Sequence, residues 1–289
     1  MNKKFRLGLV WILLSGLLIT ILGCDPSLTV LQGNGTQERP YRVYTEYHLK
    51  TIAERHKGTD TPVYMTQEAD IRLKRTWTPI WPVTIVEKKN NDGSLKEVEL
   101  TGGFRGIYDG QGYSISGLTI KGTNSPGAGV GLFGAIRGLD TEIKNIKLIN
   151  TDIVGLAEQQ VGSIAGIVYE VATISNIQVS GTVEGFESVG GVVGKIVGNG
   201  RIIGCTNNAT VLARTNKAGG IVGSAILPKG DTTISQNHNA GDIRIGDKLS
   251  NSGFLGLILG FNQSPNTSIP MESNTYEPSS RLVRGDAII

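Results

Sequence analysis

The chain has 289 residues, of which 40 are glycine and only 6% are aromatic. It carries 28 basic and 25 acidic residues, and three of the basic ones (Lys3, Lys4 and Arg6) precede an apolar run at the N-terminus. The rest of the chain is therefore neutral, which argues against nucleic-acid binding, because phosphate recognition needs a clustered positive charge. The glycines follow no three-residue period, which excludes collagen, and a hydrophobic content of 39% argues against a disordered chain.

Residues 1–23 are expected to be a signal peptide. The basic segment that ends at Arg6 is followed by an apolar run over residues 7–22. This run is shorter than the roughly 20 residues that a membrane-spanning helix needs. It ends in Gly23-Cys24, which resembles the lipobox of bacterial lipoproteins. The resemblance implies that Cys24 is lipidated and anchors the protein to a membrane of the cell envelope. Residues 24–40 would then form a polar tether.

Residues 41–101 are expected to form an N-terminal capping region with one short helix. Thr45 is a favourable N-cap residue, and Leu49 and Ile52 fall on one face of a helix that would end near His56. Residues 63–65 and 71–73 alternate in the manner of strands. Residues 77–82 (Trp-Thr-Pro-Ile-Trp-Pro) are typical of an aromatic turn that is punctuated by proline.

Residues 102–262 contain an internal repeat of about 30 residues with three short apolar elements. The first element begins with an apolar residue and a glycine and ends in a second glycine. It occupies residues 130–134, 161–166, 189–194, 218–223 and, weakly, 252–256. The second begins at Ile143, Ile174, Ile202 and Ile234, and the third contains Ile153, Val183, Val211 and Ile243. Residues 263–289 would form a C-terminal cap or tail.

The length and number of these elements predict an all-β fold, a right-handed parallel β-helix, because helical repeats need longer apolar runs and propeller blades need about 40 residues. Equivalent residues of successive coils would stack into interior columns, with Val192 and Ile221 pointing inward. Lys195 and Lys217 are expected on the outside. Glycines at the corners would permit positive φ and close approach of stacked backbones. Three asparagines near one corner could form an amide ladder: Asn145, Asn176 and Asn237.

The glycine-rich element Gly219-Gly220-Ile221-Val222-Gly223 and its counterparts resemble the GLUG motif of bacterial surface proteins. The segment ahead of the repeats is also similar to the N-terminal module of that family. It contains Trp-Thr-Pro-Ile at residues 77–80 and Phe-Arg-Gly-Ile-Tyr-Asp-Gly-Gln-Gly at residues 104–112. The resemblance covers about residues 33–260. It implies a parallel β-helix of the kind found in surface lipoproteins, adhesin-like proteins and the stalks of IgA1-specific metallopeptidases, and it assigns no molecular function.

The sequence contains few candidate residues for an enzyme or metal site. A zinc peptidase would need a His-Glu-x-x-His helix, which is absent, and the chain has only His48, His56 and His238. The first two could share a helix face, but a packed or solvated face is the simpler interpretation. Glycan cleavage would need paired acids on one outer face, for which Asp109, Asp140 and Glu142 are the candidates. Asp109 precedes a glycine, which is more simply explained as turn chemistry.

Other short motifs have simpler explanations than a function. Cys205 lies in an apolar run and is expected to be a small core residue. Arg284-Gly285-Asp286 matches the integrin-recognised tripeptide near an exposed terminus, but a chance match is favoured. Two glycosylation sequons, at Asn208 and Asn266, are expected to be unused.

The sequence therefore predicts a non-enzymatic, lipid-anchored envelope protein, on the outer membrane or the cell surface, that presents a β-helical surface for adhesion or binding. It predicts no catalytic, cofactor or metal site, and its only site residue is the lipidated Cys24. The partners would be a membrane, through the lipid, and a host, matrix or glycan ligand. The alternatives are a polysaccharide-degrading or glycan-binding β-helix protein and a passive structural component.

Overall fold

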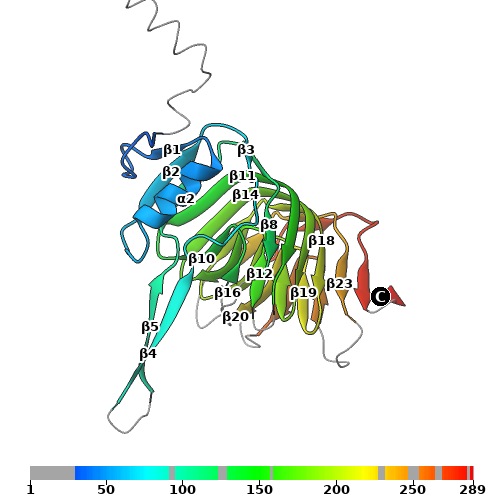
Figure 1. Cartoon of the computed structure of the whole chain (residues 1–289). Helices are drawn as coiled ribbons and strands as arrows, with labels where there is room; N and C mark the ends of the chain where they lie inside the picture. Colours follow the sequence, from blue (N-terminus) through cyan, green and yellow to red (C-terminus); the bar gives the residue numbers. More distant parts are fainter. Residues whose placement is uncertain are drawn as a thin grey trace, which may run out of the picture.

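The computed structural model describes residues 30–90, 95–122, 129–156, 159–226, 232–246, 254–263, 269–284 and 287–288. In these residues the chain forms a parallel β-solenoid, in which each turn pairs in parallel with the next (Figure 1). Helix α2 (Glu46–Arg55) lies at the N-terminal end of the stack. The predicted all-β, parallel β-helical class is therefore confirmed.

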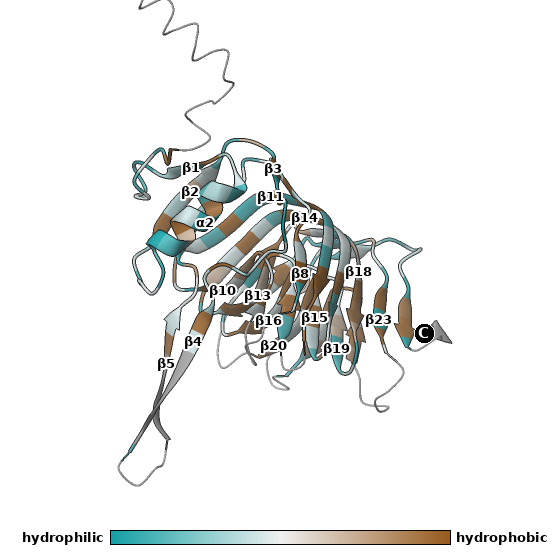
Figure 2. Ribbon diagram, viewed as in Figure 1, coloured by the Kyte–Doolittle hydropathy of each residue, from teal (hydrophilic) through white to brown (hydrophobic). Residues whose placement is uncertain are grey.

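A broad sheet of 16 strands forms one side of every turn. Polar and apolar residues alternate along its long strands, as Figure 2 shows for β11 and β14, so that one face can be buried. Its strands are β1 (Tyr41–Val43), β2 (Val63–Gln67), β3 (Ile71–Arg72), β6 (Gly106–Asp109), β7 (Ser114–Ser116), β8 (Thr119–Lys121), β11 (Thr141–Val154), β14 (Ala172–Gly185), β17 (Arg201–Ile203), β18 (Thr206–Ala213), β21 (Thr233–Ser235), β22 (His238–Asn239), β23 (Ile243–Ile245), β26 (Thr275–Tyr276), β27 (Leu282–Arg284) and β28 (Ala287–Ile288).

Two five-stranded sheets complete the turns. In each turn of the solenoid, a short loop joins a strand of one of these sheets to a strand of the other. The β9 sheet contains β9 (Gly129–Val130), β12 (Gln160–Gly162), β15 (Ser188–Gly190), β19 (Lys217–Gly219) and β24 (Phe254–Gly256). The β10 sheet contains β10 (Phe133–Arg137), β13 (Ala165–Tyr169), β16 (Val193–Val197), β20 (Val222–Ile226) and β25 (Leu259–Asn262).

The repeat positions stack as the sequence predicts. Ile143, Ile174, Ile202 and Ile234 are successive partners in the broad sheet, and so are Ile153, Val183, Val211 and Ile243. All eight side chains are fully buried, as are Val192 and Ile221. The division into elements differs from the prediction. The first element spans two strands of different sheets, and the second and third elements fuse into one strand in β11 and β14.

The role predicted for the repeat glycines is only half right. Gly162 and Gly194 do not have positive φ. They lie where the β9 and β10 sheets face each other, and a Cβ atom on Gly162 would come within 2.5 Å of the backbone nitrogen of Gly194. A Cβ on Gly194 would be equally close to the nitrogen of Val161. These glycines are therefore required because the two backbones touch, and not because of an unusual backbone conformation.

A corner of the broad sheet is one of the places with left-handed backbone conformations, and there Asn145, Asn176, Gly204 and Gln236 have φ between 52° and 65°. Asn176 Nδ2 donates to Asn145 Oδ1 at 2.7 Å, as an amide ladder requires. Asn237 does not join this ladder. It lies one residue further on, is buried, and donates through Nδ2 to Asn274 Oδ1 at 3.1 Å.

The sequence predicts Lys195 on the outside of the coils, but its side chain is only partly exposed. It projects from β16 and is half-buried, and burial together with the nearby Lys217 lowers its pKa. Lys217 is also partly buried, and its Nζ lies 5.3 Å from the centroid of the Phe261 ring.

An antiparallel hairpin interrupts one turn near the N-terminal end. Its strands, β4 (Val83–Lys89) and β5 (Leu95–Gly102), protrude from the solenoid (Figure 1). On either side of it the chain pairs with β10, through parallel bridges from Ile80 to Phe133 and from Phe104 to Ile136. The hairpin is therefore an excursion from a single turn. None of the helices in the described part of the chain is long and apolar enough to cross a membrane.

Candidate functional site

Helix α2 supplies one wall of a groove at the N-terminal end of the solenoid. The helix begins after Thr45, whose Oγ1 accepts a hydrogen bond from the backbone N–H of His48 at 3.3 Å, as expected for an N-cap. Leu49 and Ile52 are fully buried against the solenoid core. The predicted helix is thus confirmed, including its N-cap and its end at His56.

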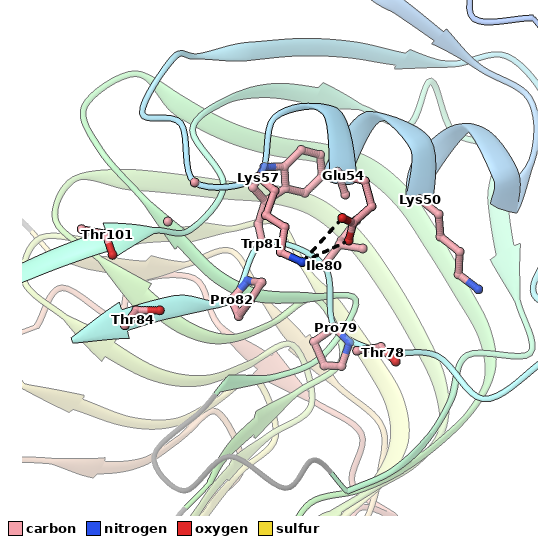
Figure 3. A pocket seen from close by; sticks show the side chains of 13 residues that line it. Lys50, Glu54, Lys57, Thr78, Pro79, Ile80, Trp81, Pro82, Thr84 and Thr101 are labelled. Carbon is pink, nitrogen blue, oxygen red and sulfur yellow. Dashed lines mark hydrogen bonds and ion pairs between the residues drawn. The ribbon is translucent and has the colours of Figure 1, made fainter. Parts of the chain in front are cut away.

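Three charged residues of the helical region face the groove: Lys50, Glu54 and Lys57. Their spacing of four and three residues puts them in one line along the helix. Figure 3 shows Lys57 turned toward Glu54, to which its Nζ lies at 3.5 Å, whereas Lys50 extends away from them. Both members of the Lys57–Glu54 pair are largely exposed, so the pair is weak and available to a ligand.

The floor of the groove is the segment 78–82, held against β10 through its backbone. The Ile80 N–H donates to the carbonyl of Leu132 at 3.2 Å, and the Ile80 carbonyl accepts from Gly134 at 2.7 Å. Trp81 accepts through its carbonyl from Ala135 at 3.1 Å. These bonds fix the rings of Trp81 and Pro82 relative to the solenoid.

Trp81 adopts a conformation that costs energy. Its φ is +48°, in the left-handed region that bulky residues avoid at a cost of roughly 1–2 kcal/mol. Its ring is held by Phe104 (centroids 5.0 Å apart, edge to face) and by Phe133 (5.9 Å, stacked). Such strain persists only where the surroundings impose it, and it is frequent at ligand-binding sites.

The base of the β4–β5 hairpin forms the opposite wall. Thr84 and Thr101 are direct partners across the hairpin and both line the groove (Figure 3). The hairpin is closed at Gly102, where a Cβ atom would lie 2.5 Å from the carbonyl oxygen of Pro82. The buried guanidinium of Arg137 donates to the Gly102 carbonyl and to the carboxylate of Asp60, which ties the base of the hairpin to the loop after α2.

Together these walls enclose a cleft of about 530 Å³, within the range of about 300–1,000 Å³ that is usual for small-ligand sites. A second cleft of about 550 Å³ lies on the other side of Lys50, which lines both. The second cleft is lined by Tyr44, Thr45, Glu46, Tyr47, Lys50, Asp70, Ile71, Arg72, Lys74 and Arg75. We call the two clefts together the α2 groove.

Charge is unevenly distributed in the α2 groove. Burial would raise the pKa of Glu46, but hydrogen bonds from Lys50 Nζ (2.5 Å) and from the Lys74 N–H (3.0 Å) outweigh it and hold the pKa below its usual value. Glu46 is therefore ionised and already engaged. The side chains of Arg72, Lys74 and Arg75 are exposed and form no ion pair with any described residue. The groove has five basic and three acidic side chains, whereas the chain that follows the basic N-terminal segment is neutral.

The acids singled out in the sequence do not meet in one site. Asp109 Oδ1 accepts from the Gln111 N–H and from Asn145 Nδ2, both at 2.9 Å, which confirms its role in a turn. Glu142 forms an ion pair with Lys144 at 2.6 Å. Asp140 is exposed in a turn with φ of +60°.

The histidines of α2 have structural contacts. His48 is fully buried and accepts through Nδ1 from the Tyr44 N–H at 3.1 Å, and burial lowers its pKa. His56 Nε2 lies 3.2 Å from the Tyr41 hydroxyl, and burial followed by the charge of Arg55 lowers its pKa. Among the described residues no three His, Cys, Asp or Glu side chains are grouped in a way that could hold a metal ion.

The remaining predicted residues lie elsewhere. Cys205 is fully buried in the core as expected, and burial raises the pKa of its thiol to about 12. Asn208 is exposed on β18. Cys24, Asn266 and the Gly285-Asp286 part of the tripeptide lie outside the described residues, while Arg284 ends β27.

The sequence did not predict the α2 groove. The sequence indicates two of its parts, the helix and the Trp-Thr-Pro-Ile-Trp-Pro segment, but only as separate local features. Their meeting depends on the pairing of Ile80 with β10, a long-range contact with no local signal. The hairpin wall is an insertion that follows no repeat, so periodicity could not have found it.

A second arrangement of polar side chains lies at the C-terminal end. Thr275 Oγ1 lies 2.8 Å from His238 Nδ1, and His238 Nε2 lies 3.3 Å from Glu277 Oε1. The parallel pairing of His238 with Thr275 brings the first two side chains together. The order hydroxyl, imidazole, carboxylate is that of a nucleophile, a base and an orienting acid. None of the three lines either cleft of the α2 groove.

Comparisons with known proteins extend the fold assignment. No protein-family model matches the chain. Over 167 residues it is 28% identical to halomucin of Haloquadratum walsbyi, an alignment that covers 57% of this chain and 2% of halomucin, so the chain corresponds to a small fraction of that protein. The crystal structure of a "putative immunoglobulin A1 protease" from Bacteroides ovatus matches 89% of this chain and 80% of its own, with a TM-score of 0.59 and 18% identity. At this identity the likeness shows a shared fold.

Proposed function

We propose that this protein is a lipid-anchored component of the bacterial cell envelope that presents its β-solenoid as a binding surface, for adhesion, and has no enzymatic activity. The observation that carries the binding role is the α2 groove, whose floor, helical wall and hairpin wall are each fixed by backbone pairing or buried contacts. The anchoring is supported by the sequence of residues 3–24 alone. Its partners are the membrane, through the lipid on Cys24, and a host, matrix or glycan ligand.

Finer features of the fold belong to the same proposal. We infer a right-handed coil, in which α2 covers the N-terminal end of the core. Both inferences are supported by the resemblance of the repeats to GLUG-motif proteins. The fold shared with the Bacteroides ovatus protein is compatible with them.

Anchoring is tested by replacing Cys24 with serine. The substitution is expected to abolish incorporation of radiolabelled palmitate and partitioning into detergent, because the thiol is the atom that would be acylated. Cys205→Ser, in the buried core, is the matched control and should be labelled like the wild type. Equal labelling of the Cys24 variant would refute lipid anchoring.

Display at the cell surface is tested separately, by treating intact cells with protease. The β4–β5 hairpin protrudes from the solenoid and is expected to be cut first (Figure 1). A periplasmic protein should stay intact as the control for membrane integrity. Complete protection of the chain on intact cells would exclude a role in adhesion to other cells or matrix.

Acyl-group hydrolysis is a second candidate function, favoured by the alignment of Thr275, His238 and Glu277. If it is correct, the protein hydrolyses a chromogenic ester, and Thr275→Ala or His238→Ala removes this activity. Thr182→Ala, on an exposed position of β14, is the control. Hydrolysis no faster than in buffer, or unchanged in the Thr275 variant, would discard this candidate.

A further inference from the structure

We propose that the α2 groove binds an acidic polysaccharide, a chain of pyranose rings that carry carboxylates such as uronic acids. This inference rests on the proposed binding role and names the ligand class. It follows from the different chemistry of the two clefts and from the small number of free main-chain hydrogen-bonding groups in the floor of the first cleft.

The cleft between α2 and the hairpin suits a sugar ring. Its floor presents the exposed ring of Pro82 beside Trp81, an apolar surface on which the C–H face of a pyranose can pack. Thr84 and Thr101 offer hydroxyls on one wall, and the loosely paired Glu54 and Lys57 offer a carboxylate and an ammonium group on the other (Figure 3). An apolar floor with hydroxyl-binding groups on both sides fits a ring that has an apolar face and a polar edge.

A peptide is a poorer occupant of the same cleft. Extended peptides are recognised largely through main-chain hydrogen bonds. Pro79 and Pro82 have no N–H group, and the two backbone groups of Ile80 are bonded to Leu132 and to Gly134 of β10. The carbonyls of Trp81 and Pro82 are also used, by Ala135 and Gly103. Few main-chain groups of the floor are therefore left for a peptide, and the side-chain hydroxyls and charges of the walls can bind a ligand.

The second cleft supplies the charge. Arg72, Lys74 and Arg75 are exposed on one edge of it; none of them forms an ion pair with a described residue, and the charge of Arg75 helps to lower the pKa of Glu46. The exposed ring of Tyr47 lies in the same cleft, which again suits a sugar face. Unpaired guanidinium and ammonium groups favour carboxylates, and arginine can bind them in a bidentate manner.

Lys50 joins the two clefts, so one ligand can occupy both. Its Nζ is held by Glu46 at 2.5 Å and lies 5.2 Å from the centroid of the Trp77 ring, which fixes it at the junction. Each cleft has the volume of a small-ligand site, and together they accommodate several linked rings. A short anionic oligosaccharide is the ligand that uses the rings, the hydroxyls and the cations at once.

The experiment is calorimetric titration of the full-length protein in detergent micelles with three probes of equal length. An alginate hexasaccharide has sugar rings and carboxylates, an isomaltohexaose has rings without charge, and hexaglutamate has charge without rings. We expect the alginate probe to bind at least about tenfold more tightly than either other probe, because only it engages both clefts. Equal binding of isomaltohexaose or of hexaglutamate would overturn the proposal, as would the absence of binding by all three.

Variants then place the binding in the groove. Thr84→Val combined with Thr101→Val removes the hydroxyls of one cleft, and Lys74→Met combined with Arg75→Met removes charge from the other. Each pair should weaken alginate binding by about tenfold, since it removes hydrogen bonds or charge contacts to the ligand. The matched controls are Thr182→Val on β14 and Arg201→Met on β17, both exposed in the broad sheet. Alginate binding that responds to the controls and not to the groove variants would refute the assignment.

Failure of this inference can be distinguished from failure of the proposed function. A chain that is labelled by palmitate and cut on intact cells, but does not bind alginate, keeps its envelope role and loses the ligand assignment. A chain that binds alginate but is neither acylated nor exposed to protease keeps the ligand and loses the proposed location.

Discussion

This chain needs glycine for two reasons: to let neighbouring atoms approach closely, as at Gly191, and to allow positive φ, as at Gly112. A Cβ on Gly191 would lie 2.2 Å from the carbonyl oxygen of Gly220 and 2.5 Å from Asn207 Oδ1, although Gly191 has no positive φ. Gly112 has φ of +80° and open space around it. We expect Gly191→Ala to lower the free energy of unfolding by about 1–3 kcal/mol through steric overlap, and Gly112→Ala by about 1 kcal/mol through backbone strain. Denaturant titration that ranked the two in the reverse order would contradict this account.

The interior columns give a second prediction at the scale of single residues. Val192 is fully buried between turns. Val192→Asp places a carboxylate there without a partner and should destabilise the fold by several kcal/mol. Thr182→Asp, on an exposed position of the broad sheet, should have little effect. Thermal melting of both variants distinguishes the two environments, and equal melting temperatures would show that the register of the turns is wrong.

Single residues were predicted well where their environment follows from the repeat. Val192, Ile221 and Cys205 are buried as expected, because equivalent positions of a repeat share one environment. Lys195 was misjudged, because its burial depends on the β9 sheet that faces β16. The separation between facing sheets is set by the glycines of both, and a single repeat does not reveal it.

Helix α2 is the element whose stability should depend on pH. The pKa values of His48 and His56 are both lowered in the folded protein, chiefly by burial. An unfolded chain therefore takes up these protons first, and stability should fall as the pH drops below the ordinary histidine value of about 6.5. His48→Asn keeps a hydrogen-bond acceptor for the Tyr44 N–H but cannot titrate, so it should flatten the loss measured between pH 7.5 and 5.

A matched variant isolates this effect. Thr182→Asn, on an exposed position of β14, introduces the same side chain without removing an ionisable group, so it should leave the slope of stability against pH unchanged. The same slope in wild type and in the His48 variant would show that acid acts elsewhere in the fold.

Elements were predictable to the extent that their signals are local. The cap and apolar face of α2 are encoded within a dozen residues, and its limits were predicted correctly. The β4–β5 hairpin was missed because it breaks the repeat, and it supplies a wall of the α2 groove. The groove thus combines one locally encoded element with one insertion. For this reason the sequence alone indicates a binding protein but does not locate the binding site.

At the scale of the whole molecule, the two ends of the stack differ. The N-terminal end has a tightly packed group of aromatic rings that includes Trp81, Phe104 and Phe133. At the other end Leu255, Leu257 and Leu259 are only partly buried, and Phe254 is exposed. In a stacked protein each turn is stabilised mainly by its neighbours, so an incompletely covered turn should open most easily.

Hydrogen exchange measures this difference directly. Amide protons of β24 and β25 should exchange faster than those of β13 and β16, which lie between two neighbouring turns. Peptides from the two regions serve as internal controls for each other. Uniform protection along the stack would mean that the solenoid opens as a single cooperative unit.

The contact between the β9 and β10 sheets constrains how this protein can evolve. Because the backbones meet at Gly162 and Gly194, no layer of side chains exists there that could be repacked around a larger residue. A substitution at either position must separate the sheets, and parallel pairing transmits that displacement to the adjoining turns. Variation among descendants of this chain should therefore accumulate in outward-facing residues, in the hairpin and along α2. Specificity for a ligand can then diverge quickly on a framework whose glycines hardly change.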